Sequence, residues 1–228
     1  MTHLVLVRHG ETAWNHDGRL QGQTDVPLSE FGRAQAARLR GRLRDEPFAA
    51  AYSSDLSRCW ETATTVVADR DVPLRPMVGL REVHLGAWQG RSWDELRAAE
   101  PAAVAWVEAD LANRAPPGGE TRRELQARVV GAIKEIAAAH PDEQVLVVSH
   151  GGALRAFLCW VLDADLLASR RIELDNAGVC RVDLRGDSRT LVGWNDVSHL
   201  AGLVHPAASS PGVERPPSRV PPTCCRPL

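Results

Sequence analysis

The sequence of 228 residues contains no apolar stretch that approaches the length of a membrane-spanning helix, which is about 20 residues. Its charges also nearly cancel, because 27 Lys and Arg stand against 29 Asp and Glu, for a formal net charge of -2. Such a balance creates no overall field that would attract nucleic acid or a membrane surface. We therefore expect a partner of neither kind, although the balance does not exclude a local basic pocket.

Cysteine is scarce, and its spacing argues against a zinc site. None of the five cysteines forms a C-x-x-C pair, and the adjacent Cys224 and Cys225 cannot easily bridge each other. Cys59, Cys159 and Cys180 stand singly in apolar or helical surroundings, so we expect buried thiols. The N-terminus lacks a basic segment followed by an apolar one. We therefore expect a cytoplasmic protein without a metal ion or other cofactor.

The length and the hydrophobic fraction of 44% suit one domain with a proper core. From His205 onward the composition changes, and seven of the last 24 residues are proline. Such a segment has little apolar surface to bury. We therefore expect one domain over residues 1–204 and a Pro-rich, disordered tail over residues 205–228.

Apolar runs alternate with amphipathic segments along the domain. This alternation predicts an α/β three-layer sandwich, in which helices cover both faces of a mostly parallel, mixed sheet. Ser29 is positioned to cap a helix whose inner side would carry Ala34, Ala37 and Leu39. The expected strands are residues 4–7, 48–52, 71–74, 145–148, 179–184 and 190–194. The expected helices are 30–44, 56–68, 101–110 and 153–162, with two more that begin after the capping-box residues Ser92 and Thr121.

Four polar residues follow expected strands or extended segments. His9 comes after the first strand, Arg58 after the second, Glu82 after an extended stretch, and His150 after the strand VLVV. Ligands of open α/β sheets bind beyond the carboxyl ends of the strands. We therefore expect these four side chains to converge on one edge of the sheet, together with Arg8. Each also has a plainer interpretation, as a solvated surface residue or as a residue of a tight turn.

Six segments carry distinctive motifs along the chain, and in order they are RHGETAWN, LQGQTDVPLSEFGRAQA, SSDLSRCWETA, LREVHLGAWQG, PPGGET and VVSHGG. Together they resemble the histidine phosphatase superfamily, whose members include the phosphoglycerate mutases. The resemblance covers about residues 3–200 and implies a helical lid over residues 92–120.

The resemblance implies that His9 is the nucleophile, phosphorylated during turnover, and that Glu82 is the proton donor. Arg8, Arg58 and His150 would complete the phosphate pocket, because guanidinium groups match phosphate oxygens. A backbone carbonyl would hold one nitrogen of His9, so that the other stays free to attack. Further candidates for binding phosphate or substrate lie in nearby loops or beside His150, with a surface-loop role as the alternative. These are Asn15, Gly22, Gln23 and Gly151.

A phosphatase is favoured over a cofactor-dependent phosphoglycerate mutase. The mutases carry E-R-H-Y-G around the proton donor, and here Val83 and Leu85 stand where polar residues are expected. The pattern resembles glucosyl-3-phosphoglycerate phosphatases and broad-specificity or α-ribazole phosphatases. We therefore expect a metal-independent phosphomonoesterase that acts on a small phosphorylated metabolite and forms a homodimer. The alternatives are a mutase and a non-catalytic protein that binds phosphoryl groups.

Overall fold

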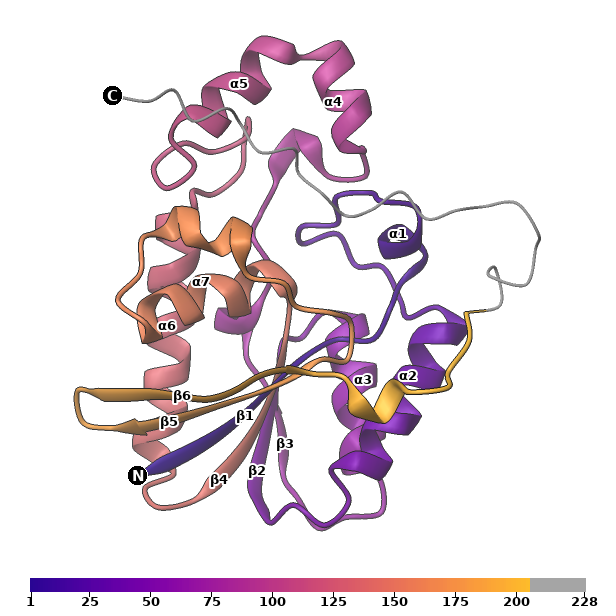
Figure 1. Ribbon diagram of the computed structural model, residues 1–228, viewed down its shortest axis with the longest axis vertical. Helices are drawn as coiled ribbons and strands as arrows, with labels where there is room; N and C mark the ends of the chain where they lie inside the picture. Colours follow the sequence, from indigo (N-terminus) through magenta and orange to yellow (C-terminus); the bar gives the residue numbers. More distant parts are fainter. Residues whose placement is uncertain (206–228) are drawn as a thin grey trace.

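The computed structural model of the protein describes residues 1–205, and Figure 1 shows how its elements are arranged. The first half contains β1 (Thr2–Arg8), α1 (Ala13–His16), α2 (Glu30–Arg42), β2 (Phe48–Ser53), α3 (Ser57–Val67), β3 (Leu74–Pro76), α4 (Trp93–Ala99) and α5 (Pro101–Ala109). The second half contains α6 (Arg122–Ala139), β4 (Gln144–Ser149), α7 (Gly151–Val161), β5 (Val179–Arg185) and β6 (Ser188–Asp196).

The six strands form one mixed sheet in the order β3-β2-β4-β1-β5-β6. Strand β4 pairs in parallel with both β1 and β2, and β3 pairs in parallel with β2. Strands β5 and β6 extend the sheet in antiparallel pairing beside β1. The register places Arg8 opposite Ser149, so the central strands end side by side. His9 and His150, which follow these two strands, therefore lie at the same edge of the sheet.

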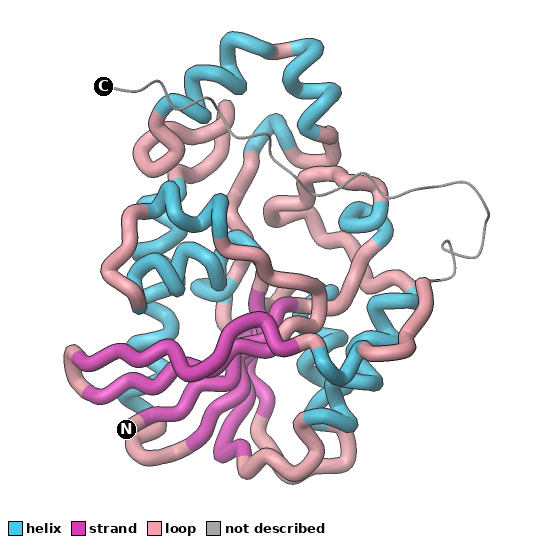
Figure 2. The backbone as a smooth tube through the Cα atoms, in the orientation of Figure 1, coloured by secondary structure: helices cyan, strands magenta, loops and turns pink. Residues whose placement is uncertain are grey.

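Helices cover both faces of the sheet, which explains why the central strands are apolar without alternation. Leu4 and Leu6 of β1 point into a core that includes α6 and α7. Val5 and Val7 point into a second core, with residues of α2 and α3. Figure 2 shows the strands between these helical layers. The expected α/β sandwich is confirmed.

The helices α4 and α5 lie apart from the sheet, at the top of the view in Figure 1. Trp88 is fully buried in the core that these helices share with α6, whereas Trp106 of α5 is 53% exposed. The expected helical insertion is present, and Trp88 has a packing role. No helix of residues 1–205 has the length and apolar character needed to cross a membrane.

Two local expectations were wrong. The third strand begins at Leu74 rather than at Asp71, and Pro73 contributes only its carbonyl, which accepts from the Ala51 backbone N–H at 2.9 Å. On α2 the inner side carries Gly32, Gln35, Ala36 and Leu39, while Ala37 is exposed. The expected buried thiols Cys59, Cys159 and Cys180 are confirmed. Apart from His205, the expected tail lies outside the described residues.

Candidate active site

A cavity of about 180 Å³ lies where β1 and β4 end. Its lining combines five arginines with one carboxylate, that of Glu82. The concentration of cations in one place contrasts with the near-zero balance of the whole chain. The lining residues are Arg8, His9, Asn15, Arg19, Leu20, Gln21, Gly22, Arg58, Glu82, Val83, Leu85, Arg122, Gly152 and Arg155.

His9 is fixed in one tautomer by its own loop. Its backbone N–H donates to Ser149 O at 3.0 Å, which continues the pairing of β1 with β4. Its Nδ1 lies 2.6 Å from Gly10 O, and a carbonyl can only accept, so Nδ1 carries the proton. The lone pair on Nε2 is therefore free. Burial lowers the pKa of His9 well below its usual value, and the nearby Arg58 and Arg8 lower it further. The ring is consequently neutral, as a nucleophile must be.

His150 is buried beside His9, with the ring centroids 5.2 Å apart in an edge-on arrangement. Its Nδ1 accepts from Arg58 Nε at 3.2 Å, which places its proton on Nε2, 2.9 Å from Ser54 Oγ. The Cys59 sulfur lies 3.3 Å from the same Nε2. Burial lowers the pKa of His150 well below its usual value, and Arg58 and His9 add to the effect. His150 is thus neutral and carries an N–H donor on Nε2.

Arg58 ties the pocket together from the first turn of α3. Its side chain is completely buried, and its two outer nitrogens donate to Gly22 O at 2.7 Å and Thr24 O at 2.8 Å. Gly22 has a φ of 54°, a conformation that favours glycine. Burial lowers the pKa of Arg58, but a guanidinium of this kind stays charged at neutral pH. Arg58 thus fixes the Gly22 loop and His150 and keeps a positive charge between them.

Arg8 is the second cation at the base of the pocket. Its Nη1 donates to Leu174 O at 2.6 Å, while its buried Nε has no partner among residues 1–205. Burial, with a contribution from Arg155, lowers the pKa of Arg8 to about 10, so it stays charged at neutral pH. A buried N–H without a partner is costly. An anion bound in the cavity would satisfy it.

The carboxylate of Glu82 is held by the first turn of α7. Its Oε2 accepts from Gly152 N at 2.9 Å, and its Oε1 accepts from Ala153 N at 3.1 Å and from Val83 N at 2.9 Å. Free backbone N–H groups at a helix N-terminus favour such a negative charge. The segment that carries His150 therefore also positions Glu82.

The four further candidates divide into two groups. Asn15 and Gly22 line the cavity, and Asn15 Oδ1 also accepts from Thr12 N at 3.1 Å. Gln23 and Gly151 lie behind it: Gln23 Nε2 donates to Glu82 O at 3.1 Å, and a Cβ built on Gly151 would lie 3.3 Å from Arg8 Nε. His150 is likewise not among the lining residues. These three support the groups that face the cavity.

Three lining arginines were not predicted: Arg19, Arg122 and Arg155. Arg122 directly follows the motif PPGGET, and burial lowers its pKa. Arg155 lies four residues after Gly151, on the same face of α7, and its Nε donates to Gly151 O at 3.0 Å. Its helical spacing from the VVSHGG motif was the available signal. Arg19 lies in a polar loop, where nothing local distinguishes it from a surface residue.

Two glycines allow α2 to approach the chain directly after His9. A Cβ built on Gly10 would lie 2.5 Å from Gly32 O, and one on Gly32 would lie 2.0 Å from Glu11 O. In addition, Glu11 N donates to Gln35 Oε1 at 2.8 Å. The helix therefore packs backbone to backbone against the loop that carries His9.

A model of the histidine phosphatase superfamily (branch 1) matches residues 4–197. The chain belongs to this superfamily. The expected family and its fold are thus confirmed.

The relatives of this chain include proteins named as phosphatases and proteins named as phosphoglycerate mutases. A metal-independent phosphoserine phosphatase of Arabidopsis thaliana is 39% identical over 206 residues, with 89% of this chain and 85% of the relative covered. A probable phosphoglycerate mutase of Cronobacter sakazakii is 36% identical over 211 residues, with 88% and 95% covered.

Solved structures extend the likeness to three dimensions. The protein YhfR of Bacillus stearothermophilus superposes with a TM-score of 0.82 at 36% identity, covering 88% of this chain and 100% of that one. A mycobacterial glucosyl-3-phosphoglycerate phosphatase complexed with VO3 gives 0.76 at 34% identity, with 85% and 98% covered. Like these phosphatase relatives, the chain is a phosphoric monoester hydrolase.

Proposed function

We propose that His9 is the nucleophile of a two-step hydrolysis. In the first step Nε2 forms a bond to phosphorus and the ester P–O bond breaks. Glu82, which takes up a proton from solvent when the phosphate dianion binds beside it, gives that proton to the leaving oxygen. In the second step water attacks phosphorus, the N–P bond breaks, and Glu82 takes up a proton of the water. The products are the alcohol and inorganic phosphate. The hydrogen bond from Nδ1 to Gly10 O carries this proposal, because it leaves Nε2 free.

The remaining groups would stabilise the charge of the transferring phosphoryl group. Arg8 and Arg58 supply N–H donors at the base of the cavity, and His150 lies directly behind them. Fixed donors in a buried site stabilise developing charge more strongly than water does. These steps use side chains of the chain alone, so we expect activity to persist in EDTA.

Hydrolysis is favoured over mutase activity by the side of the cavity near Glu82. Val83 and Leu85 both line it, and neither can bind a carboxylate or a second phosphate. A mutase must retain a bisphosphate while it reorients, and Val83 and Leu85 replace the polar side chains that the mutase motif E-R-H-Y-G places beside the proton donor. Tight phosphate binding without turnover would instead indicate the docking alternative.

The substrate, we further propose, carries a carboxylate or similar anion besides its phosphate. Phosphate is a dianion, and Arg8 and Arg58 already match its charge. Arg19, Arg122 and Arg155 add three cations to the same cavity of about 180 Å³. Phosphoserine and phosphoglycerate esters are substrates of this class, and relatives are named for both.

The test is phosphate release in EDTA from phosphoserine, 3-phosphoglycerate, glucosyl-3-phosphoglycerate, α-ribazole phosphate and p-nitrophenyl phosphate. We expect the carboxylate-bearing esters to have the highest kcat/KM. In Arg122→Met, KM for these esters should rise about tenfold or more, while KM for p-nitrophenyl phosphate changes little. An exposed arginine, Arg38→Met, is the control. Isomerisation of 3-phosphoglycerate without net release would contradict hydrolysis, and an equal effect on all esters would contradict the carboxylate role.

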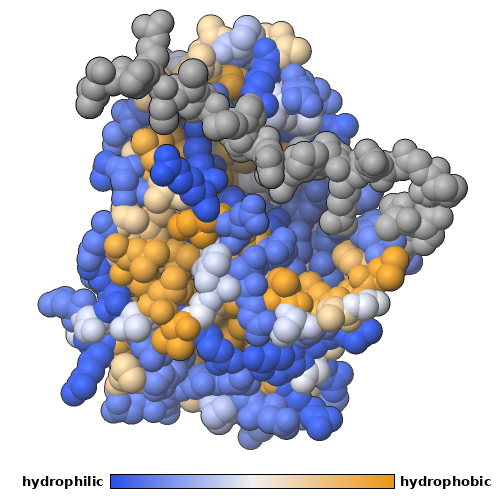
Figure 3. Space-filling view, in the orientation of Figure 1, coloured by the Kyte–Doolittle hydropathy of each residue, from blue (hydrophilic) through white to orange (hydrophobic). Residues whose placement is uncertain are grey.

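A cytoplasmic location and a homodimer also remain our proposals. Three buried free thiols suit a reducing compartment. Figure 3 shows apolar side chains gathered over α7 and the β5–β6 ribbon, and Leu162, Leu167 and Val192 are each at least half exposed. A dimer would cover such side chains. Size-exclusion chromatography with light scattering of the wild type and of Val192→Lys would test it, with a monomeric variant expected.

A further inference from the structure

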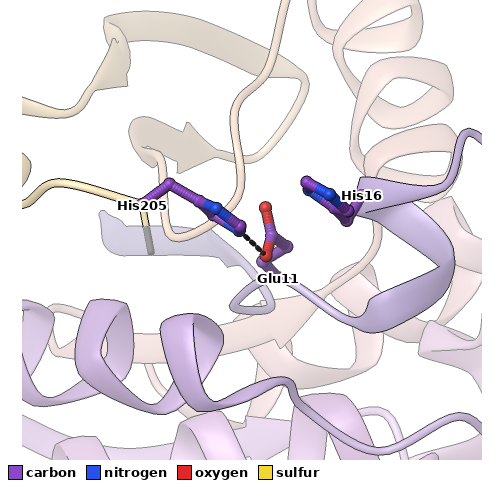
Figure 4. A group of neighbouring side chains, drawn as sticks. All are labelled: Glu11, His16 and His205. Atoms are coloured by element: carbon purple, nitrogen blue, oxygen red, sulfur yellow. Dashed lines mark hydrogen bonds and ion pairs between the residues drawn. The ribbon is translucent and has the colours of Figure 1, made fainter. Parts of the chain in front are cut away.

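A second group of two histidines and one glutamate lies beside the active-site loop. Glu11 follows the His9-Gly10 dipeptide, His16 ends the one-turn helix α1, and His205 comes from the end of the described chain. Figure 4 shows the three side chains turned toward one another from these separate segments. One ligand atom of each lies within 4.8 Å of those of the other two. The proposed hydrolysis uses none of the three.

The contacts within this group arrange it around the carboxylate. His205 Nε2 lies 3.1 Å from Glu11 Oε1, and Ser29 Oγ donates to the same oxygen at 3.2 Å. The His16 and His205 rings are stacked, with centroids 4.7 Å apart and planes only 2° from parallel. The Glu11 and His205 side chains are each only 12% exposed. Glu11 is thus buried and His205 partly buried, and the contact between them holds both.

We infer that Glu11, His16 and His205 form a binding site for a zinc-like divalent transition metal ion. Imidazole nitrogens and a carboxylate oxygen are ligands that such ions bind, and three protein ligands leave one tetrahedral position for water. The lone pair of an imidazole nitrogen lies in the plane of its ring. The stacked rings of His16 and His205 therefore point their lone pairs along two parallel planes, and one ring must rotate before both can bind the same ion. His16 is exposed and can turn, whereas His205 is held by Glu11 and lies against Phe31 at 4.5 Å.

The ion would join two parts of the chain that are far apart in sequence. In the sequence, Asn15 lies between Glu11 and His16, and it lines the catalytic cavity. His205 follows the short 3-10 helix η4 (Ser198–Leu200). A bound ion would therefore connect the segment that contains His205 to the loop that follows His9. It lies beside a second cavity, of about 430 Å³, which Glu11 and His205 help to line and through which an ion can enter. Its role is structural, and hydrolysis does not depend on it.

The test is Co²⁺ and Zn²⁺ binding by full-length, tag-free protein. Cys224 and Cys225 lie outside the described residues and can bind Zn²⁺, so Cys224→Ser/Cys225→Ser is the background for every variant. We expect one equivalent of Zn²⁺ by titration calorimetry, and visible Co²⁺ absorption without a thiolate band. Zn²⁺ should raise Tm by about 5 °C or more at a hundredfold excess over Kd.

Variants then locate the ion. His16→Gln, His205→Gln and Glu11→Gln should each weaken binding at least tenfold, whereas His3→Gln, a partly exposed histidine of β1, should bind as the background does. No binding by the background protein would overturn the inference, and so would binding that survives the His16 and His205 changes. Phosphate release in EDTA is measured in parallel. Its presence without metal binding would overturn the metal site alone, and its absence with metal binding would overturn the hydrolase alone.

Discussion

The chain builds two groups of two histidines and one glutamate, and their surroundings differ in charge. His9 and His150 lie edge-on, 5.2 Å apart, with Arg8 and Arg58 beside them and Glu82 held by α7. In the other group, His16 and His205 stack, and a carboxylate contacts His205 directly. Burial, together with the neighbouring cations, keeps the first pair neutral, and the cations leave it suited to an anion. The carboxylate makes the second group suited to a cation. The same residue types thus serve opposite ligands.

Among the changes that test the difference between the two groups, the loss of His9 is expected to have the largest effect. His9→Ala should lower kcat for phosphate release by about 10⁴-fold or more, because no other group would form the covalent intermediate. Quenched-flow trapping of the phosphoenzyme should find acid-labile label in the wild type and none in the variant. The matched control is His3→Ala, which removes a histidine of β1, the strand that precedes His9, where it contacts Asp183. Substantial turnover by His9→Ala would remove the distinction between the two groups.

The next largest effect is expected for Glu82, the glutamate of the first group. Glu82→Gln keeps the shape but cannot donate a carboxyl proton, so we expect kcat for alkyl phosphates to fall by about 10²–10⁴-fold. For p-nitrophenyl phosphate, whose leaving group needs no proton, the loss should be below tenfold. Steady-state kinetics on the two substrates gives the ratio. A similar loss for both would show that Glu82 is not the acid.

The free energy of unfolding should report the neutrality of the first pair. The folded pKa values of His9 and His150 are lowered, so below about pH 6.5 the unfolded chain binds more protons than the folded one. The contribution of the two neutral histidines to the free energy of unfolding is therefore complete above about pH 6.5. As the pH drops below this value, the free energy of unfolding falls by up to about 3 kcal/mol per pH unit for two buried groups.

Urea denaturation from pH 7.5 to 5.5 measures this slope above the range in which ordinary carboxylates titrate. His9→Asn should reduce the slope by about half. A stability that stays constant over this range would contradict two buried neutral histidines.

The smallest effect concerns the second group without metal. Glu11→Gln replaces the carboxylate that His205 and Ser29 contact, and we expect a loss of about 1 kcal/mol in EDTA at pH 7.5. The exposed pair of Glu61 with Arg33 provides the comparison, since Glu61→Gln should cost less than about 0.5 kcal/mol. Equal losses would mean that the partly buried group is no more than a surface contact.

The sequence sufficed for the fold and for the groups that follow strands. Four continuous apolar residues precede Arg8 and His9, and four precede Ser149 and His150. Neighbouring parallel strands end at the same edge of the sheet, so these two histidine positions were predictable. The inner side of α2 was predicted less well, because Gly32 and Gln35 are buried through backbone contacts with Glu11 rather than through hydrophobicity.

Residues that meet only through the tertiary fold were beyond local reasoning. Arg19 reaches the cavity from a polar loop, and Arg122 reaches it from the start of α6. Arg19 has no neighbouring motif that distinguishes it from a solvated cation, and Arg122 follows PPGGET at the start of a helix, where a solvated arginine is equally ordinary. The same holds for His205, since its contact with Glu11 joins positions 194 residues apart.

The close approach of Gly10 and Gly32 limits how this protein can vary. At most buried positions, a larger side chain on one element is accommodated by a smaller one on its neighbour. Here each glycine faces peptide backbone, which has no smaller version. No second-site change of side chain can compensate for a Cβ at either position. Directed evolution of this enzyme toward new esters is therefore free to alter the lid and Arg19, Arg122 and Arg155, but it must leave this pair of glycines together.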